Sequence, residues 1–122
     1  MIIVGAGLSG LLTAWGCLDV NPNFTITIID AADEIGGDHT WSFNLSDVPI
    51  FLQDWIKPFI AYQWPRYDVR FPNRNRTLEI PYCSGNSESL RKCVQPYIDS
   101  GRLKTRLGVK ALSVEPQTVA LD

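Results

Sequence analysis

Met1-Ile2-Ile3-Val4-Gly5-Ala6-Gly7-Leu8-Ser9-Gly10 opens a chain of 122 residues and decides its fold. Four apolar residues predict a short strand, and the three glycines that follow have the spacing G-x-G-x-x-G. The next segment, to about Asp19, has the apolar spacing of a helix, and residues 24–29 are rich in β-branched side chains. Asp30 ends this second strand. Strand, glycine turn, helix, strand and acid together predict a dinucleotide-binding βαβ unit.

Each glycine of this turn has a physical task. Gly5 permits the tight exit from the strand, and Gly7 lets backbone N–H groups approach a pyrophosphate, because neither has a Cβ. Gly10 lets the helix pack closely on the strands. The helix N-terminus offers unpaired N–H donors, so we expect the amides of this loop, that of Ala6 included, to bind phosphate. Asp30 is expected to accept hydrogen bonds from a ribose diol. The alternative is a glycine-rich turn that binds nothing.

A second glycine pair, Gly36-Gly37, follows six residues after Asp30. It resembles the pair that lies near the flavin phosphates in flavoproteins of the glutathione-reductase type, and Thr40 can supply a hydroxyl group there. This favours FAD over NAD, although a simple two-glycine turn remains the alternative. His39 is the only histidine, and a lone histidine is more often a structural or surface residue than a ligand.

Composition indicates a globular chain without a nucleic-acid partner. Hydrophobic residues make up 45% of the chain, charged residues 20%, and the net charge is −2. Cys17, Cys83 and Cys93 have neither metal-binding nor redox spacing, so we expect buried thiols and no metal site. We expect no secretory leader before the first strand, and no apolar stretch approaches the ~20 residues that cross a bilayer.

The rest of the chain predicts two helices and several short strands. No second βαβ crossover is recognised after Asp30, so we expect a fold that is incomplete at its C-terminus. The expected helices run from a cap at Ser46 or Asp47 to about Lys57, and from a cap at Ser87 to a kink or end near Gln95, before Pro96. The expected strands are 67–71 and 77–80 around a turn at 72–75, then 103–109, and a hairpin of 111–114 with 118–121.

We therefore predict a single partial FAD-binding domain of the α/β class over residues 1–122. A Rossmann-type FAD-binding βαβ unit occupies residues 1–43, and an α+β segment with hairpins occupies residues 44–122. A substrate domain is absent from this prediction.

Aromatic and basic residues gather in the middle of the sequence, and each group has two interpretations. Nine of the thirteen aromatic residues lie between Trp41 and Phe71, as a ring-filled core or as the lining of a tunnel for a long apolar substrate. Four arginines form either a solvated face or a surface for cofactor phosphates or anionic lipid headgroups. These are Arg66, Arg70, Arg74 and Arg76.

Two motifs resemble those of bacterial lycopene β-cyclases. Residues 36–43, Gly-Gly-Asp-His-Thr-Trp-Ser-Phe, closely resemble the family's GGxHTWSF motif. Trp64-Pro65 with Tyr67, Val69 and 70–72 (Arg-Phe-Pro) resembles its WPxYxVRFP segment. The resemblance covers essentially the whole chain and is strongest over residues 1–76. Asp38 replaces an asparagine that many relatives carry, and residues 83–101 match only loosely.

The resemblance implies an enzyme that closes β-ionone rings at the ends of lycopene, giving β-carotene, without net redox change. It implies reduced FAD as cofactor, with NAD(P)H as electron source, and lycopene or a related carotenoid as substrate. It also implies an intramolecular lyase or isomerase that is cytoplasmic and peripheral on the inner face of the bacterial plasma membrane. His39 joins the expected cofactor-binding residues because it belongs to the family motif. These residues are Gly5, Ala6, Gly7, Gly10, Asp30, Gly36, Gly37, His39 and Thr40.

The family's proton-donating acid, by the same resemblance, lies beyond Asp122, so no catalytic residue is assigned and this chain alone is expected to be inactive. Nothing singles out one of the carboxylates at hand, which are Asp33, Glu34, Asp38, Asp54 and Glu79. A flavin-dependent monooxygenase or desaturase fragment is one alternative, against which the motif at residues 39–43 argues. A non-catalytic fragment that binds nucleotide is the other.

Overall fold

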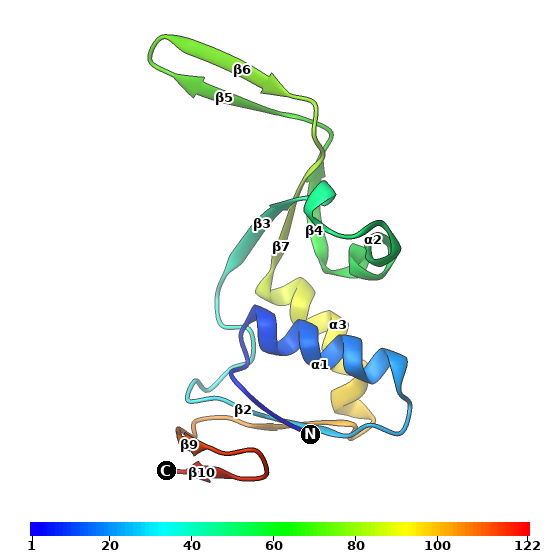
Figure 1. Ribbon diagram of the computed structural model, residues 1–122, viewed down its shortest axis with the longest axis vertical. Coiled ribbons are helices and arrows are strands. Elements are labelled where there is room, and N and C mark those ends of the chain that lie inside the picture. The colour runs from blue at the N-terminus through cyan, green and yellow to red at the C-terminus, as the bar shows by residue number, and fades with distance from the viewer.

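The computed structural model of residues 1–122 contains the predicted βαβ unit (Figure 1). Strand β1 (Ile2–Val4) pairs in parallel with β2 (Ile26–Ile29), and helix α1 (Leu8–Val20) connects them. Gly5 follows β1 directly, at φ +103°, a left-handed conformation that glycine adopts without the strain of a side chain. The turn Asn21-Pro22-Asn23 follows α1, and the Asn21 side chain accepts the Asn23 N–H at 3.0 Å.

A third parallel strand corrects the expectation that no second crossover exists. Strand β8 (Leu103–Arg106) pairs in parallel with β2, giving the sheet order β1-β2-β8. Helix α3 (Ser87–Asp99) leads into β8 and lies with α1 on the same side of the sheet (Figure 1). The sequence pattern does not indicate this crossover, because residues 30–86 form another sheet and a hairpin between β2 and α3.

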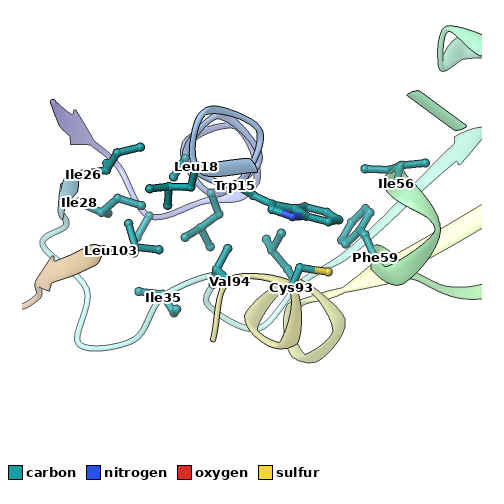
Figure 2. Close-up of a cluster of buried hydrophobic side chains, with 14 residues drawn as sticks. Trp15, Leu18, Ile26, Ile28, Ile35, Ile56, Phe59, Cys93, Val94 and Leu103 are labelled. Carbon is teal, nitrogen blue, oxygen red and sulfur yellow. The ribbon is translucent and has the colours of Figure 1, made fainter. Parts of the chain in front are cut away.

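The main core lies between this sheet and the two helices. Leu11 and Leu18 of α1, Ile28 of β2, and Leu90 and Val94 of α3 are each at most 1% exposed. Figure 2 shows that Trp15, Cys93 and Phe59 continue this cluster toward the second sheet. Burial of this apolar surface is the main free-energy source that fixes the helices on the sheet.

A second, antiparallel sheet has the order β3-β7-β4. Its strands are β3 (Thr40–Asn44), β7 (Tyr82–Asn86) and β4 (Ile60–Trp64). A 3-10 turn η1 (Leu45–Asp47), helix α2 (Ile50–Ile56) and a 3-10 turn η2 (Lys57–Phe59) connect β3 to β4.

The predicted cap of this helix at Ser46 or Asp47 is wrong. Pro49 disfavours a helical conformation at the residue before it, and Val48 is extended, with φ −93° and ψ 125°. Helix α2 therefore begins only after Pro49 and has no side-chain cap.

The hairpin formed by β5 (Tyr67–Phe71) and β6 (Arg74–Leu78) projects away from both sheets (Figure 1). We call residues 67–78 the arm. The hairpin was predicted, but its turn is only Pro72-Asn73, so β6 begins earlier than expected. A second hairpin, β9 (Ala111–Val114) with β10 (Val119–Leu121), confirms the prediction for the C-terminal residues.

Helix α3 differs from its prediction at both ends. Its cap is Asn86, whose Oδ1 accepts the Ser89 N–H at 2.8 Å, while the Ser89 hydroxyl accepts the Asn86 N–H at 3.0 Å. Ser87, the predicted cap, makes other contacts, described below. Pro96 neither ends nor breaks the helix, because it lies on the exposed side, where water can satisfy the carbonyl of Lys92 that loses its partner.

Candidate functional site

The glycine loop between β1 and α1 presents free backbone donors. Gly7 occupies the N-cap position of α1 and has no side chain to cap it. The N–H groups of Leu8, Ser9 and Gly10, in the first turn, therefore have no acceptor within the helix. A Cβ built on Gly7 would meet no atom within 4 Å, so the space beside these donors is open. Such a helix terminus attracts anions through both its donors and its dipole.

Gly10 packs so closely that no other residue fits. A Cβ at this position would lie 2.0 Å from the carbonyl oxygen of Gly5. The contact sets the distance between the first turn of α1 and the end of β1.

Asp30 and Ala6 are brought together by a hydrogen bond. One carboxylate oxygen of Asp30 accepts the Ala6 N–H at 2.5 Å, and the other accepts the Ala32 N–H at 2.8 Å. A carboxylate has about four acceptor sites, so these bonds leave capacity for a ligand hydroxyl. The Ala6 N–H, one of the predicted phosphate donors, is thus occupied by the predicted ribose acceptor.

The double-glycine loop, which contains Gly36 and Gly37, also bonds to Ala6. Gly36 and Gly37 have φ +73° and +55°, a left-handed pair that residues with side chains rarely adopt. The Gly36 N–H donates to the Ala6 carbonyl at 2.7 Å. Ala6 therefore connects Asp30, the glycine loop and the double-glycine loop.

His39 and Thr40 lie at the start of β3, immediately after this loop, and both are exposed. The His39 ring lies beside that of Trp41, with 5.6 Å between centroids. Their backbone is held by neighbouring chain: the His39 N–H donates to the Ser87 hydroxyl at 2.8 Å, and Thr40 pairs with Asn86. Both side chains are thus available to a ligand near Gly37.

Two hollows open beside the glycine loop. The first, about 220 Å³, borders Gly5 and Asp30 and is completed by residues 109–111, which follow β8. The second, about 520 Å³, runs from Leu8 and Leu12 of α1 along residues 40–43 to Phe59. Its walls are largely apolar. The loop thus lies between a small site near the acid and a larger apolar groove.

Neither interpretation, a ring-filled core or the lining of a tunnel, accounts for all of the aromatic residues. Trp41, Phe43 and Phe59 line the apolar groove, and Trp55 packs on Trp15 at 4.2 Å between centroids. Other rings lie on or near the arm and are exposed, including Tyr62, Trp64 and Phe71.

Several residues of this site were not found from the sequence. Val109 donates its N–H to the Asp30 carbonyl at 3.0 Å, and Lys110 lines the small hollow. Ser87 and Arg91 of α3 contact the double-glycine loop. Ser87 carried a signal, a serine at a helix start, but that signal pointed to capping. Val109, Lys110 and Arg91 had no local signal, because contacts between residues distant in the sequence bring them to the site.

Two of the three cysteines, Cys83 and Cys93, are buried as expected, whereas Cys17 is partly exposed. Burial raises the pKa of Cys93 to about 11, with help from the nearby negative charge of Asp19, and burial also raises the pKa of Cys83. Both thiols therefore hold their protons near neutral pH and are weak nucleophiles.

None of the helices combines the length and the apolar character needed to span a bilayer.

Comparison with known proteins shows the family from sequence and the fold from structure. A family described as "Lycopene cyclase protein" matches residues 1–121. A lycopene beta-cyclase of Pantoea ananas is 40% identical over 95 residues, which are 78% of this chain and 25% of that protein. A lycopene beta-cyclase of Pseudescherichia vulneris is 39% identical over 88 residues, 72% of this chain and 23% of that protein. The chain spans about a quarter of the length of these curated relatives.

Solved structures share the fold at low identity. PqsL, a probable FAD-dependent monooxygenase from Pseudomonas aeruginosa, superimposes with a TM-score of 0.67 at 14% identity, over 99% of this chain and 37% of that chain. The oxygenase of 2-methyl-3-hydroxypyridine-5-carboxylic acid gives 0.65 at 13% identity, over 98% and 34%. At such identities the likeness shows the fold alone, which is that of FAD-dependent oxygenases.

Proposed function

The chain belongs to the lycopene cyclase protein family, and on this premise we propose that it is the FAD-binding N-terminal part of a lycopene β-cyclase. The observation that carries the proposal is the meeting of two glycine loops and an acid at Ala6. The motif at residues 36–43 lies at this junction and supports a cyclase over other flavoproteins of the same fold.

The residues present fit a dinucleotide. Three first-turn N–H groups lack helix acceptors, Gly7 leaves space beside them, and a carboxylate with spare acceptor capacity lies next to the same loop. In this proposal the first-turn amides bind the diphosphate, Asp30 binds the adenosine ribose, and the small hollow beside Val109 accepts the adenosine. The flavin end then extends toward Thr40 and the apolar groove.

FAD, when bound in its reduced form, supplies an electron-rich ring that favours developing positive charge nearby. The chain's own contribution is binding and orientation: the glycine loops hold phosphate, and the groove walls at Trp41, Phe43 and Phe59 exclude water from an apolar ligand. No carboxylate in these residues is assigned as the proton donor. NAD(P)H as the electron source belongs to the same proposal.

The proposed substrate is lycopene or a related carotenoid, taken from the cytoplasmic surface of a membrane. The arm supports this part, because exposed Phe71 lies close to Arg70 and Arg74 at its tip. Aromatic and cationic side chains together favour the interface of an anionic bilayer. Sedimentation with vesicles of anionic lipid, compared with neutral vesicles, tests it, and equal recovery in both supernatants would count against it.

Flavin binding is tested by titrating the purified chain with FAD and following flavin fluorescence. Asp30→Ala is expected to weaken binding by about 1–3 kcal/mol, the range for a hydrogen bond with a charged partner. Asp38→Ala is the matched control, because Asp38 is exposed and lies next to the double-glycine loop. Equal affinities of the two variants would remove Asp30 from the ribose site.

Cyclase activity is tested separately. The 122-residue chain with lycopene and reduced FAD is expected to give no β-carotene, because no proton donor is assigned within it. Turnover by this chain would show that the acid lies among its own carboxylates.

A further inference from the structure

Helix α3 holds the double-glycine loop through two side chains, and we propose that Ser87 and Arg91 are positioning residues for the flavin site. The inference rests on the proposed flavin-binding function and adds two residues that do not belong to the glycine loops. Neither is placed against the ligand. Both act through the backbone of residues 35–39.

Ser87 is a buried polar residue, 2% exposed, and its hydroxyl forms hydrogen bonds with the double-glycine loop and with His39. Its Oγ donates to the Gly36 carbonyl at 2.7 Å and accepts the His39 N–H at 2.8 Å. Its backbone N–H donates to the His39 carbonyl at 3.0 Å. Asn86 and Ser89 complete the cap of α3 without it, so the hydroxyl is free to serve residues 36 and 39.

Arg91 lies one turn further along α3 and spans the loop. A single nitrogen, Nη1, donates to the Ile35 carbonyl at 3.1 Å and to the Gly37 carbonyl at 3.0 Å. The Glu34 carboxylate lies 4.0 Å away. Two carbonyls on either side of Gly36 are thereby fixed to the same helix.

These contacts matter because they hold the backbone of the loop beyond Ile35, whose side chain is buried in the main core. Two consecutive left-handed glycines have the greatest conformational freedom of any residue pair, and ordering them costs entropy. The side chains of α3 hold one side of the loop, and the bond from Gly36 N–H to the Ala6 carbonyl holds the other. If the loop is already ordered before the ligand binds, its ordering entropy is not lost on binding, and the affinity is higher.

The test compares Ser87→Ala with Ser84→Ala. Ser84 is the other buried serine, 6% exposed, and its Oγ bonds to the Ser42 hydroxyl at 2.6 Å in the second sheet. Both variants lose one buried hydroxyl and are expected to lose similar stability. Only Ser87→Ala is expected to weaken FAD binding, by about tenfold, while Ser84→Ala stays within about twofold of the wild type.

A second pair of variants removes an arginine that bridges carbonyls. Arg91→Gln is compared with Arg102→Gln, because one nitrogen of Arg102, Nη2, also donates to two carbonyls, those of Leu18 at 2.7 Å and Asn21 at 2.6 Å, at the far end of α1. Arg91→Gln is expected to weaken FAD binding about tenfold, and Arg102→Gln to leave it unchanged within about twofold.

Amide hydrogen exchange in the chain without FAD separates this inference from the proposed function. Ser87→Ala is expected to lower the protection of the Gly36 and His39 amides at least tenfold relative to Ile28, whereas Ser84→Ala leaves that ratio unchanged. Unchanged protection in Ser87→Ala, or unchanged FAD affinity of a chain that binds FAD, overturns the positioning role. Lost protection in a chain that does not bind FAD shows that Ser87 orders the loop, but removes the proposed function and with it the flavin as the ligand of that loop.

Discussion

Backbone hydrogen bonds between strands hold both the three-stranded parallel sheet and the projecting arm. The two regions differ in what covers them, because α1 and α3 pack on the sheet only. Ile28 in β2 and Leu11 in α1 are fully buried, while Phe71 in β5 is 60% exposed. The arm has a complete antiparallel ladder, yet isolated two-stranded hairpins are marginal in water. The stability of this chain is therefore concentrated where helices cover a sheet, and the arm contributes little to it.

The largest effect is expected at Phe59, which connects the main core to the second sheet. Its ring is 2% exposed and packs against Trp41 and Phe43, at centroid distances of 6.0 and 6.2 Å. Phe59→Ala is expected to cost about 3–5 kcal/mol in the free energy of unfolding, measured by urea denaturation. Phe51→Ala is the control, because Phe51 is 82% exposed. A loss below about 1 kcal/mol at Phe59 would mean that the two sheets do not share a core.

Two glycines of α1 are expected to respond to the same substitution with opposite signs. Gly10→Ala puts a Cβ 2.0 Å from the Gly5 carbonyl, so about 1–3 kcal/mol of destabilisation is expected. Gly16→Ala meets only the Trp55 ring, at 3.7 Å, and is expected to stabilise the helix by about 0.5–1 kcal/mol. Thermal unfolding of both variants measures the difference, and the same sign for both would contradict the close packing at Gly10.

A smaller effect is expected from pH, through the buried thiol of the core. Burial raises the pKa of Cys93 from an ordinary value near 9 to about 11, so the folded chain keeps a proton that the unfolded chain loses. Stability is therefore expected to fall as pH rises from about 9 to about 11. Burial also raises the pKa of Tyr97 to about 12, with the hydrogen bond to Asp19 adding to it, which gives the same sign.

Urea midpoints between pH 8 and 11 measure this slope. Cys93→Ala is expected to have a shallower slope than the wild type, because the ionisable group is removed. Identical slopes would show that the thiol does not ionise differently in the folded and unfolded chains.

Local signals were enough to predict the fold near the glycine loop. The spacing of Gly5, Gly7 and Gly10, followed by Asp30, specified strand, turn, helix and strand, and each element is present. The alternation at residues 67–71 likewise predicted the first strand of the arm. The contacts that define these segments join residues that are close in the sequence, within one strand or one βαβ unit. The spacing of residues in the sequence is therefore enough to predict them.

What was missed depends on contacts between distant residues. Strand β8 pairs with β2 although residues 30–86, which form another sheet and a hairpin, lie between β2 and α3 in the sequence, and no local pattern indicates that pairing. Asn86 and Ser87 are both good capping residues, and only the position of the double-glycine loop decides which of them caps α3. Pro96 stays within the helix because of its exposure, which the sequence does not specify.

The smallest effect is expected in the arm. Phe71→Ala is expected to change the free energy of unfolding by less than about 0.5 kcal/mol, because its ring lies in solvent and removing it opens no cavity. The same substitution at Phe59 deletes the same atoms from a packed site, so the pair isolates burial from chemistry. Urea denaturation at two protein concentrations measures it. A loss of about 2 kcal/mol at Phe71 that grows with concentration would mean that the arm is covered by a second copy of the chain. A concentration-independent loss of that size would mean that the arm folds back onto the body, and either result would end the contrast between the two regions.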